Sequence, residues 1–75
     1  APPAAERLAP SRQRLARRIR MLRAVHGWSQ DTLAELSGIH RTYISTIEQG
    51  RCNVSLETLD KLARAFDATA GELLS

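Results

Sequence analysis

The stretch "LSGIHRTYIST", residues 36–46, interrupts a chain whose residues otherwise favour helix almost throughout. Gly38 can adopt the left-handed backbone conformation that ends a helix. After it comes a polar, hydroxyl-rich segment whose apolar residues recur only every third or fourth position, which is the period of one helix face. The stretch therefore predicts two short helices joined by a turn at residues 37–39.

The two helices on either side of this turn are predicted at residues 30–37 and 41–49. Ser29 is a suitable N-cap for the first, with Trp28 and Leu33 at the spacing of a hydrophobic staple. Gly50 ends the second helix as Gly38 ends the first. Helices of this length are marginal alone in water and need tertiary packing. Two such helices joined by a short glycine-containing turn have the layout of a helix-turn-helix.

The flanking sequence predicts three more helices. Residues 1–10 hold three prolines and four alanines with little periodicity, which we interpret as a flexible arm that precedes one domain over residues 11–75. A first helix is expected from the N-cap Ser11 to Gly27, because Leu15, Ile19 and Leu22 share one face. Ser55 caps a fourth helix, and a capping box opens the fifth. The apolar face of the fourth is Leu56, Leu59, Leu62, Ala63 and Phe66, and the capping box is Thr69 with Glu72. The fold class is all-α.

The composition argues against a membrane-spanning or secreted protein. The 75 residues are 43% hydrophobic and 25% charged, and no apolar run approaches the roughly 20 residues that span a bilayer. The start lacks the charged and apolar regions of a secretory signal. Cys52 is the only cysteine, so no internal disulfide forms and a cytoplasmic location is expected.

Charge is divided unevenly along the chain. Residues 1–28 contain seven Arg and one Glu, whereas residues 29–75 contain four basic and seven acidic residues. A basic half joined to an acidic half suggests a polyanionic partner on one face. An Arg-rich helix with a solvated face explains the same charge equally well, and it is the better default for Arg17 and Arg18.

The predicted third helix has two different faces. Ile44, Ile47 and Glu48 point to one side, toward the other helices. The opposite side is polar, short-chained and nearly uncharged, and holds Arg41, Thr42, Ser45, Thr46 and Gln49. Ser and Thr lower helix propensity, so local stability does not explain them. They do suit a helix that enters a groove and bonds to base edges, although an ordinary exposed face is the simpler alternative.

The sequence "IRMLRAVHGWSQDTLAELSGIHRTYISTIEQGRCNVSLETLDKLARAF" resembles the Xre/Cro/C1-type helix-turn-helix family. The resemblance covers residues 12–74 and rests on the runs W-S-Q-x-x-L-A-x-x-S-G and Y-I-S-x-I-E-x-G, followed by N-x-S-L-x-T-L-x-K-L-A-x-A. It implies a compact five-helix, lambda-repressor-like helix-turn-helix domain that binds double-stranded DNA.

The resemblance also implies roles for single residues. Arg41, Thr42 and Thr46 occupy positions that reach base edges in the major groove, with Arg41 able to bond guanine at O6 and N7 or to hold a phosphate. Gln30 sits where the family places a phosphate contact at a helix N-terminus. The remaining implied backbone contacts are Tyr43, Ser45, Gln49, Arg51 and Asn53. Tyr43 is equally well explained as half-buried packing.

Two further positions matter for the geometry. Arg23 and Glu48 match a family pair that often forms a salt bridge between the first and third helices, which would fix orientation more than it adds stability. His40 departs from the family, which usually caps the third helix with Ser or Thr. A poorer cap implies that the helix begins one residue away, or that protonated His40 meets a phosphate.

Catalysis and metal binding are not expected. His40 and Cys52 lie twelve residues apart without a second cysteine or a histidine pair at zinc spacing. No nucleophile elbow, P-loop or H-E-x-x-H motif is present. His26 precedes a helix-ending glycine, where a cation needs no chemistry to explain it.

The sequence therefore predicts a transcriptional regulator, most simply a repressor, that needs no cofactor. A domain this small covers one half-site, so we expect a homodimer on a pseudo-palindromic operator, with Leu73 and Leu74 as dimer contacts unless the core uses them. Two alternatives stay open. One is a protein-binding or dimerisation module, antitoxin-like or partner-tethering. The other is the N-terminal module of a longer ligand-sensing regulator, because the chain lacks an initiator Met.

Overall fold

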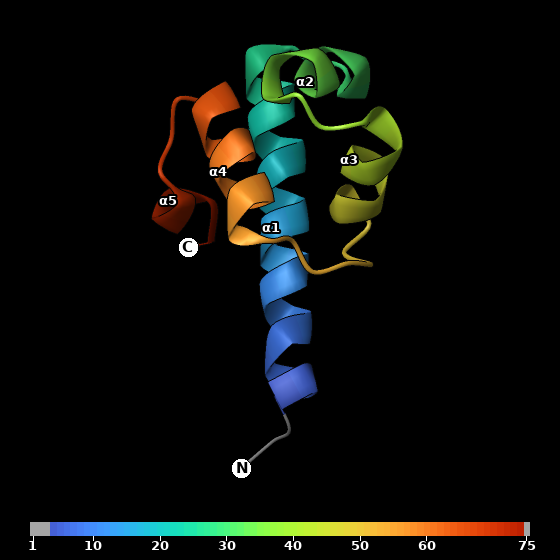
Figure 1. The fold of residues 1–75 in the computed structure, drawn as a ribbon, viewed down its shortest axis with the longest axis vertical. Coiled ribbons are helices and arrows are strands. Elements are labelled where there is room, and N and C mark those ends of the chain that lie inside the picture. Colours follow the sequence, from blue (N-terminus) through green and yellow to red (C-terminus); the bar gives the residue numbers. More distant parts are fainter. Residues whose placement is uncertain (1–3, 75) are drawn as a thin grey trace.

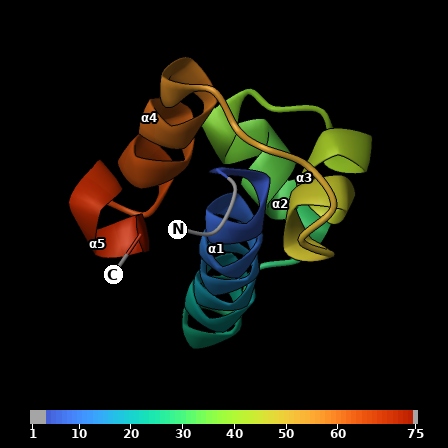
Figure 2. The same cartoon turned by 90° about the horizontal axis from the view of Figure 1, so that it is seen from below.

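The structure is a computed structural model that describes the backbone of residues 4–74 and the side chains of residues 12–74. Over this range the chain forms α1 (Ala4–His26), α2 (Gln30–Ser37), α3 (Arg41–Glu48), α4 (Leu56–Ala65) and α5 (Ala70–Leu74). Helix α1 runs through the middle, with α3 on one side and α4 and α5 on the other (Figure 1). The view from below keeps α5 and α3 on opposite sides of α1 (Figure 2). The all-α prediction is confirmed.

The N-terminal end of α1 differs from the prediction. The expected N-cap at Ser11 is wrong, because α1 begins at Ala4 and includes Pro10. Residues 4–9, which precede Pro10, are Ala, Glu, Arg and Leu, which all favour helix strongly. Proline lacks an N–H and costs about 3 kcal/mol in a helix interior, which is why the sequence pattern favoured a later start. Of the arm expected at residues 1–10, residues 1–3 lie outside the described part.

Helix α2 begins and ends as predicted. The Ser29 hydroxyl accepts a hydrogen bond from the Thr32 backbone N–H at 3.1 Å, which is the N-cap contact. Gly38 ends the helix with φ at +75°, a left-handed conformation that a residue with a Cβ adopts only with strain. The Gly38 N–H donates to the Ala34 carbonyl at 2.9 Å. The turn between α2 and α3 is therefore fixed by its backbone geometry.

Helix α3 begins at Arg41 despite its unusual cap. The His40 Nδ1 accepts a hydrogen bond from the Thr42 N–H at 3.1 Å, so imidazole takes the place of the usual hydroxyl. The predicted start of this helix is confirmed, and the alternative that it begins one residue away is wrong. The helix ends at Glu48, one residue before the predicted end, and Gln49 is its C-cap.

The last two helices carry the predicted caps. The Ser55 hydroxyl accepts from the Thr58 N–H at 3.1 Å. Thr69 and Glu72 form the capping box, with the Glu72 N–H donating to the Thr69 hydroxyl at 3.1 Å and the Thr69 N–H donating to the Glu72 carboxylate at 3.3 Å. Leu56, which the sequence analysis places on the apolar face of this helix, is 80% exposed. It occupies the first turn of α4, at the edge of the apolar stripe.

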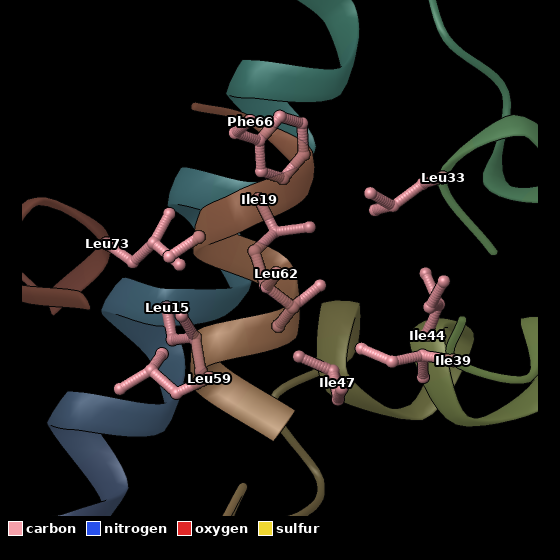
Figure 3. Packing of buried hydrophobic residues seen from close by; sticks show 11 residues of the cluster. Leu15, Ile19, Leu33, Ile39, Ile44, Ile47, Leu59, Leu62, Phe66 and Leu73 are labelled. Atoms are coloured by element: carbon pink, nitrogen blue, oxygen red, sulfur yellow. The ribbon is translucent and has the colours of Figure 1, made fainter. Parts of the chain in front are cut away.

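The core joins side chains from every helix and from the turn between α2 and α3. Figure 3 shows these side chains packed together between α1, α4 and the helix-turn-helix. The buried cluster is Leu15, Ile19, Leu33, Ile39, Ile44, Ile47, Leu59, Leu62, Ala63, Phe66 and Leu73. Ile39, directly after the Gly38 turn, is 6% exposed, so the turn itself contributes to the core. This packing holds the short helices α2 and α3, which are marginal by themselves.

An aromatic stack closes the end of the core where α1 and α4 both finish. The His26 and Trp28 rings lie 4.3 Å apart at centroids, and the Trp28 and Phe66 rings lie 5.4 Å apart. All three pairs of rings are close to parallel, with interplanar angles below 30°. Stacked rings of this kind add to the energy of apolar burial.

Candidate nucleic-acid interface

The two faces of α3 separate as the sequence predicted. Ile44, Ile47 and Glu48 are buried, with 0%, 2% and 4% of their surfaces exposed. On the other face Arg41, Thr42 and Gln49 are exposed, and Ser45 and Thr46 are half-buried. The polar face is therefore open to a partner, while the apolar face and one carboxylate hold the helix in place.

The three residues expected at base edges lie on this open face. The Arg41 side chain is 58% exposed. The Thr46 hydroxyl donates to the Thr42 carbonyl one turn earlier, at 3.1 Å. That bond uses the only hydrogen of the hydroxyl and leaves its lone pairs and the methyl group available. Thr46 is therefore suited to accept a hydrogen bond or to contact a thymine methyl group.

Arg41 forms an ion pair across the helix-turn-helix. Its Nε lies 3.5 Å from Oδ1 of Asp31, which is in the first turn of α2. The sequence analysis does not predict this contact. The periodicity of each helix does not reveal it, because the pair depends on the crossing of α2 and α3.

A buried carboxylate organises the other side of α3. Arg23 of α1 binds Glu48 through two hydrogen bonds, from Nε to Oε2 at 2.7 Å and from Nη2 to Oε1 at 2.8 Å. This ion pair is the one that the resemblance implied. Hydrogen bonding to Glu48 raises the pKa of the Arg23 guanidinium above its ordinary value. The Arg23 guanidinium therefore stays protonated throughout the physiological pH range.

The same carboxylate also holds the start of α2. Gln30 Nε2 donates to Glu48 Oε1 at 3.2 Å, and Arg23 Nη1 donates to the Trp28 carbonyl at 2.9 Å. Arg20 Nη1 donates to the backbone carbonyl of Glu48, a contact that the sequence did not suggest. These bonds fix the N-terminus of α2 relative to α3. One hydrogen of the Gln30 amide is engaged, and the second remains for a ligand.

The other expected backbone contacts surround the end of α3. Gln49 Nε2 and the Ser45 hydroxyl are 3.4 Å apart, and the Tyr43 hydroxyl lies 3.5 Å from the Asn53 carbonyl. Tyr43 is half-buried against the core, so the packing role left open from the sequence is present. Arg51 and Asn53 are exposed in the loop after Gly50.

A separate apolar groove is formed by α1, the loop between α3 and α4, and the helices α4 and α5. It is lined by Arg12, Leu15, Cys52, Asn53, Val54, Leu56, Leu59 and Leu74. Leu56 and Leu74 are 80% and 43% exposed, whereas Leu73 is fully buried in the core. Burial raises the pKa of the Cys52 thiol, and the Arg12 guanidinium partly offsets this. The thiol is therefore protonated at neutral pH.

His, Cys, Asp and Glu side chains of residues 12–74 form no group of three or more that would bind a metal ion. Among the described helices, none has the length and apolar character needed to cross a bilayer.

Comparison with known proteins gives consistent matches over most of the chain. A helix-turn-helix domain family matches residues 14–75. The control protein C.SmaI of Serratia marcescens is 44% identical over 61 residues, which are 81% of this chain and 73% of that protein. A hypothetical transcription factor of Neisseria meningitidis is 42% identical over 60 residues, 80% of this chain and 57% of that protein. The crystal structure of the restriction-modification controller protein C.AhdI from Aeromonas hydrophila superposes with a TM-score of 0.79 at 45% identity, covering 83% of this chain and 94% of that one.

Proposed function

The chain belongs to the Xre/Cro/C1-type helix-turn-helix family, and from this membership we propose that it is a transcriptional regulator, most simply a repressor, that binds double-stranded DNA of defined sequence. The observation that carries the proposal is the open face of α3, which is polar and nearly uncharged while the opposite face is locked into the core. A rigid helix with this face fits the major groove, where each base pair presents its own pattern of donors and acceptors.

In this proposal Arg41 reads a guanine, and Thr42 and Thr46 contact neighbouring bases. Arginine bonds guanine through two parallel N–H groups at O6 and N7. Thr46 contributes an acceptor and a methyl group, because its own hydrogen is used within α3. Such a set reads a short run of bases on one half-site.

Gln30 and the N-terminus of α2 then hold a phosphate. Backbone N–H groups at a helix start attract anions, and the Gln30 amide keeps one hydrogen free for the same oxygen. Contacts of this kind position a protein on the duplex without reading its sequence. We assign the same positioning role to Tyr43, Ser45, Gln49, Arg51 and Asn53.

The regulator acts as a homodimer that forms through the apolar groove. One small module buries about 600–1,000 Å² on DNA, which gives weak specific binding by itself. Leu56 and Leu74 offer the exposed apolar surface that a second copy would cover. No residue of α3 lines the groove, and of the proposed DNA contacts only Asn53 does, so both recognition helices stay free. The operator is then a pseudo-palindrome with half-sites about one helical turn apart.

We assign no enzymatic activity, cofactor or metal to this chain, and we place its action in the cytoplasm. The matched relatives include the control protein C.SmaI, of which the match spans 73%, and longer regulators such as the HTH-type transcriptional regulator PuuR of Escherichia coli, of which it spans 35%. The second form of the proposal is therefore that this chain is the N-terminal DNA-binding module of a longer regulator with a sensing domain.

Selection from a random duplex pool at near-physiological salt tests the proposal. We expect enrichment of a two-fold symmetric motif, which would establish sequence recognition and dimeric binding together. Salt-sensitive binding with no enriched motif would contradict it and favour the protein-binding module. Leu74→Glu should keep the fold and abolish the dimer in sedimentation experiments, because Leu74, unlike Leu73, is exposed.

A further inference from the structure

We propose that Asp31 is a specificity-determining residue, which holds the Arg41 guanidinium in position for a base and disfavours its use on a phosphate. This inference rests on the proposed function, in which Arg41 reads a guanine. It goes beyond that function by assigning a role to an acidic side chain on a surface that meets a polyanion.

The position of the pair argues against a role in folding. The Arg41 and Asp31 side chains are 58% and 77% exposed, and their closest atoms are 3.5 Å apart. Ion pairs this exposed contribute little to stability. The Gln30 amide already joins α2 to α3 through its hydrogen bond to the buried Glu48 carboxylate at 3.2 Å. The Asp31 contact therefore adds almost nothing that the fold needs.

The contact with Asp31 leaves the two terminal nitrogens of the Arg41 guanidinium available for a base. Asp31 approaches Nε, on the inner side of the guanidinium. Within the described residues, the two terminal nitrogens of Arg41 make no hydrogen bond or ion pair. A guanidinium held at Nε presents these nitrogens as a fork, which is the arrangement that guanine O6 and N7 accept. Holding the side chain beforehand also reduces the rotamer entropy lost on binding.

The charge of Asp31 acts against the competing mode of binding. Asp31 directly follows Gln30, whose position at the start of α2 is the proposed phosphate contact. A carboxylate there is repelled by the DNA backbone unless a cation neutralises it. When Arg41 turns toward a phosphate, Asp31 loses its partner beside that backbone. The repulsion therefore weakens the sequence-independent mode more than the specific one, and specificity is the difference between the two.

Glu35 provides a matched control for this effect. It lies one helical turn after Asp31 on α2, is exposed, and forms no ion pair within the described residues. Asp31→Asn and Glu35→Gln remove the same charge from the same helix, but only the first breaks the pair with Arg41. A difference between the two variants in the preference at the base pair that Arg41 reads excludes net charge as its cause.

The experiment measures binding of four variants to three duplexes at one salt concentration. The variants are Asp31→Asn, Asp31→Glu, Glu35→Gln and Arg41→Ala, compared with the wild type. The duplexes are the consensus recovered from the random pool, the same duplex changed at the one base pair whose preference Arg41→Ala abolishes, and a scrambled duplex. Thermal melting of each variant checks that the fold is kept.

We expect Asp31→Asn to reduce the preference for that base pair about two- to fivefold, the size that an exposed pair supports. Glu35→Gln should leave this preference unchanged, and Asp31→Glu should retain most of it. Both neutral variants should bind the scrambled duplex more tightly through net charge. Equal preferences in Asp31→Asn and Glu35→Gln would overturn the inference, as would a sharper preference in Asp31→Asn. If Arg41→Ala abolishes no preference, the Arg41 role in the proposed function fails first, and this inference fails with it.

Discussion

The two faces of the eight-residue helix α3 have opposite roles: one packs into the core and the other is open to a partner. On the buried face, Ile44 and Ile47 pack in the core and Glu48 accepts two hydrogen bonds from Arg23. On the open face, Arg41 meets Asp31 at a longer distance in solvent. Each face thus carries one ion pair, and their surroundings differ. The desolvated pair fixes the position of α3 against α1, whereas the solvated pair orients one side chain whose terminal nitrogens a partner can bind.

Truncation of the buried face should give the largest effect, and it should fall on stability alone. Ile44→Ala is expected to lower the free energy of unfolding by about 3 kcal/mol, because it leaves a cavity at a fully buried site. Urea denaturation measures this. If the variant is unfolded, Ile44→Val gives a measurable loss of about 1 kcal/mol. A change in sequence preference of the folded protein would break the distinction between the faces.

Removal of the buried carboxylate should cost slightly less. Glu48→Ala leaves the Arg23 guanidinium without its partner, and we expect a loss of about 2 kcal/mol, reduced because Arg23 keeps some contact with solvent. The control is Glu57→Ala, which removes an exposed partner of Lys61 and should change stability by less than about 0.5 kcal/mol. Equal losses in the two variants would show that burial does not distinguish these pairs.

A substitution on the open face should weaken DNA binding and leave the free energy of unfolding nearly unchanged. Arg41→Ala is expected to weaken specific binding by about 1–3 kcal/mol and to relax the preference at one base pair, with unfolding nearly unchanged. Titration against the selected and scrambled duplexes measures both effects. An equal loss for the two duplexes would make Arg41 a phosphate contact.

Gln30 of α2 contacts the buried face of α3 through Glu48, and its substitution should have the smallest effect on binding. Gln30→Ala removes an amide that binds Glu48 in the structure and a phosphate in the proposed complex. We expect about 1 kcal/mol less binding energy for every duplex alike, because a phosphate contact reads no sequence. A loss confined to the selected duplex would contradict this role and indicate that Gln30 positions a base-reading residue.

Much of the fold follows from local sequence signals. The serine caps, the left-handed Gly38 and the capping box at Thr69 act within a few residues, so pattern and spacing reveal them. The start of α1 is not predicted, because Pro10 disfavours helix while the six residues before it favour helix. A sequence pattern does not show which of these two preferences is the stronger. Periodicity places Leu56 on the apolar face of α4, but it does not show where the neighbouring helices end, so the exposure of Leu56 is not predicted.

The candidate site is less accessible to such reasoning. The separation of the α3 faces follows from a period of 3.6 residues, and the Arg23 and Glu48 pair follows from family resemblance. The contacts of Asp31, of Gln30 with Glu48 and of Arg20 with the end of α3 join different helices. They depend on crossing angles that no single helix encodes, and only the assembled structure brings them together.

The stack of His26, Trp28 and Phe66 gives the molecule an optical probe of its own. Trp28 is the only tryptophan in the chain, and it is held between the ends of α1 and α4. Its emission depends on the contact with its ring neighbours, which is lost when the helices separate. Excitation at the red edge of the indole band avoids absorption by nucleic acid. A single unlabelled sample can therefore report, during a titration with duplex, whether a variant that binds poorly is still folded.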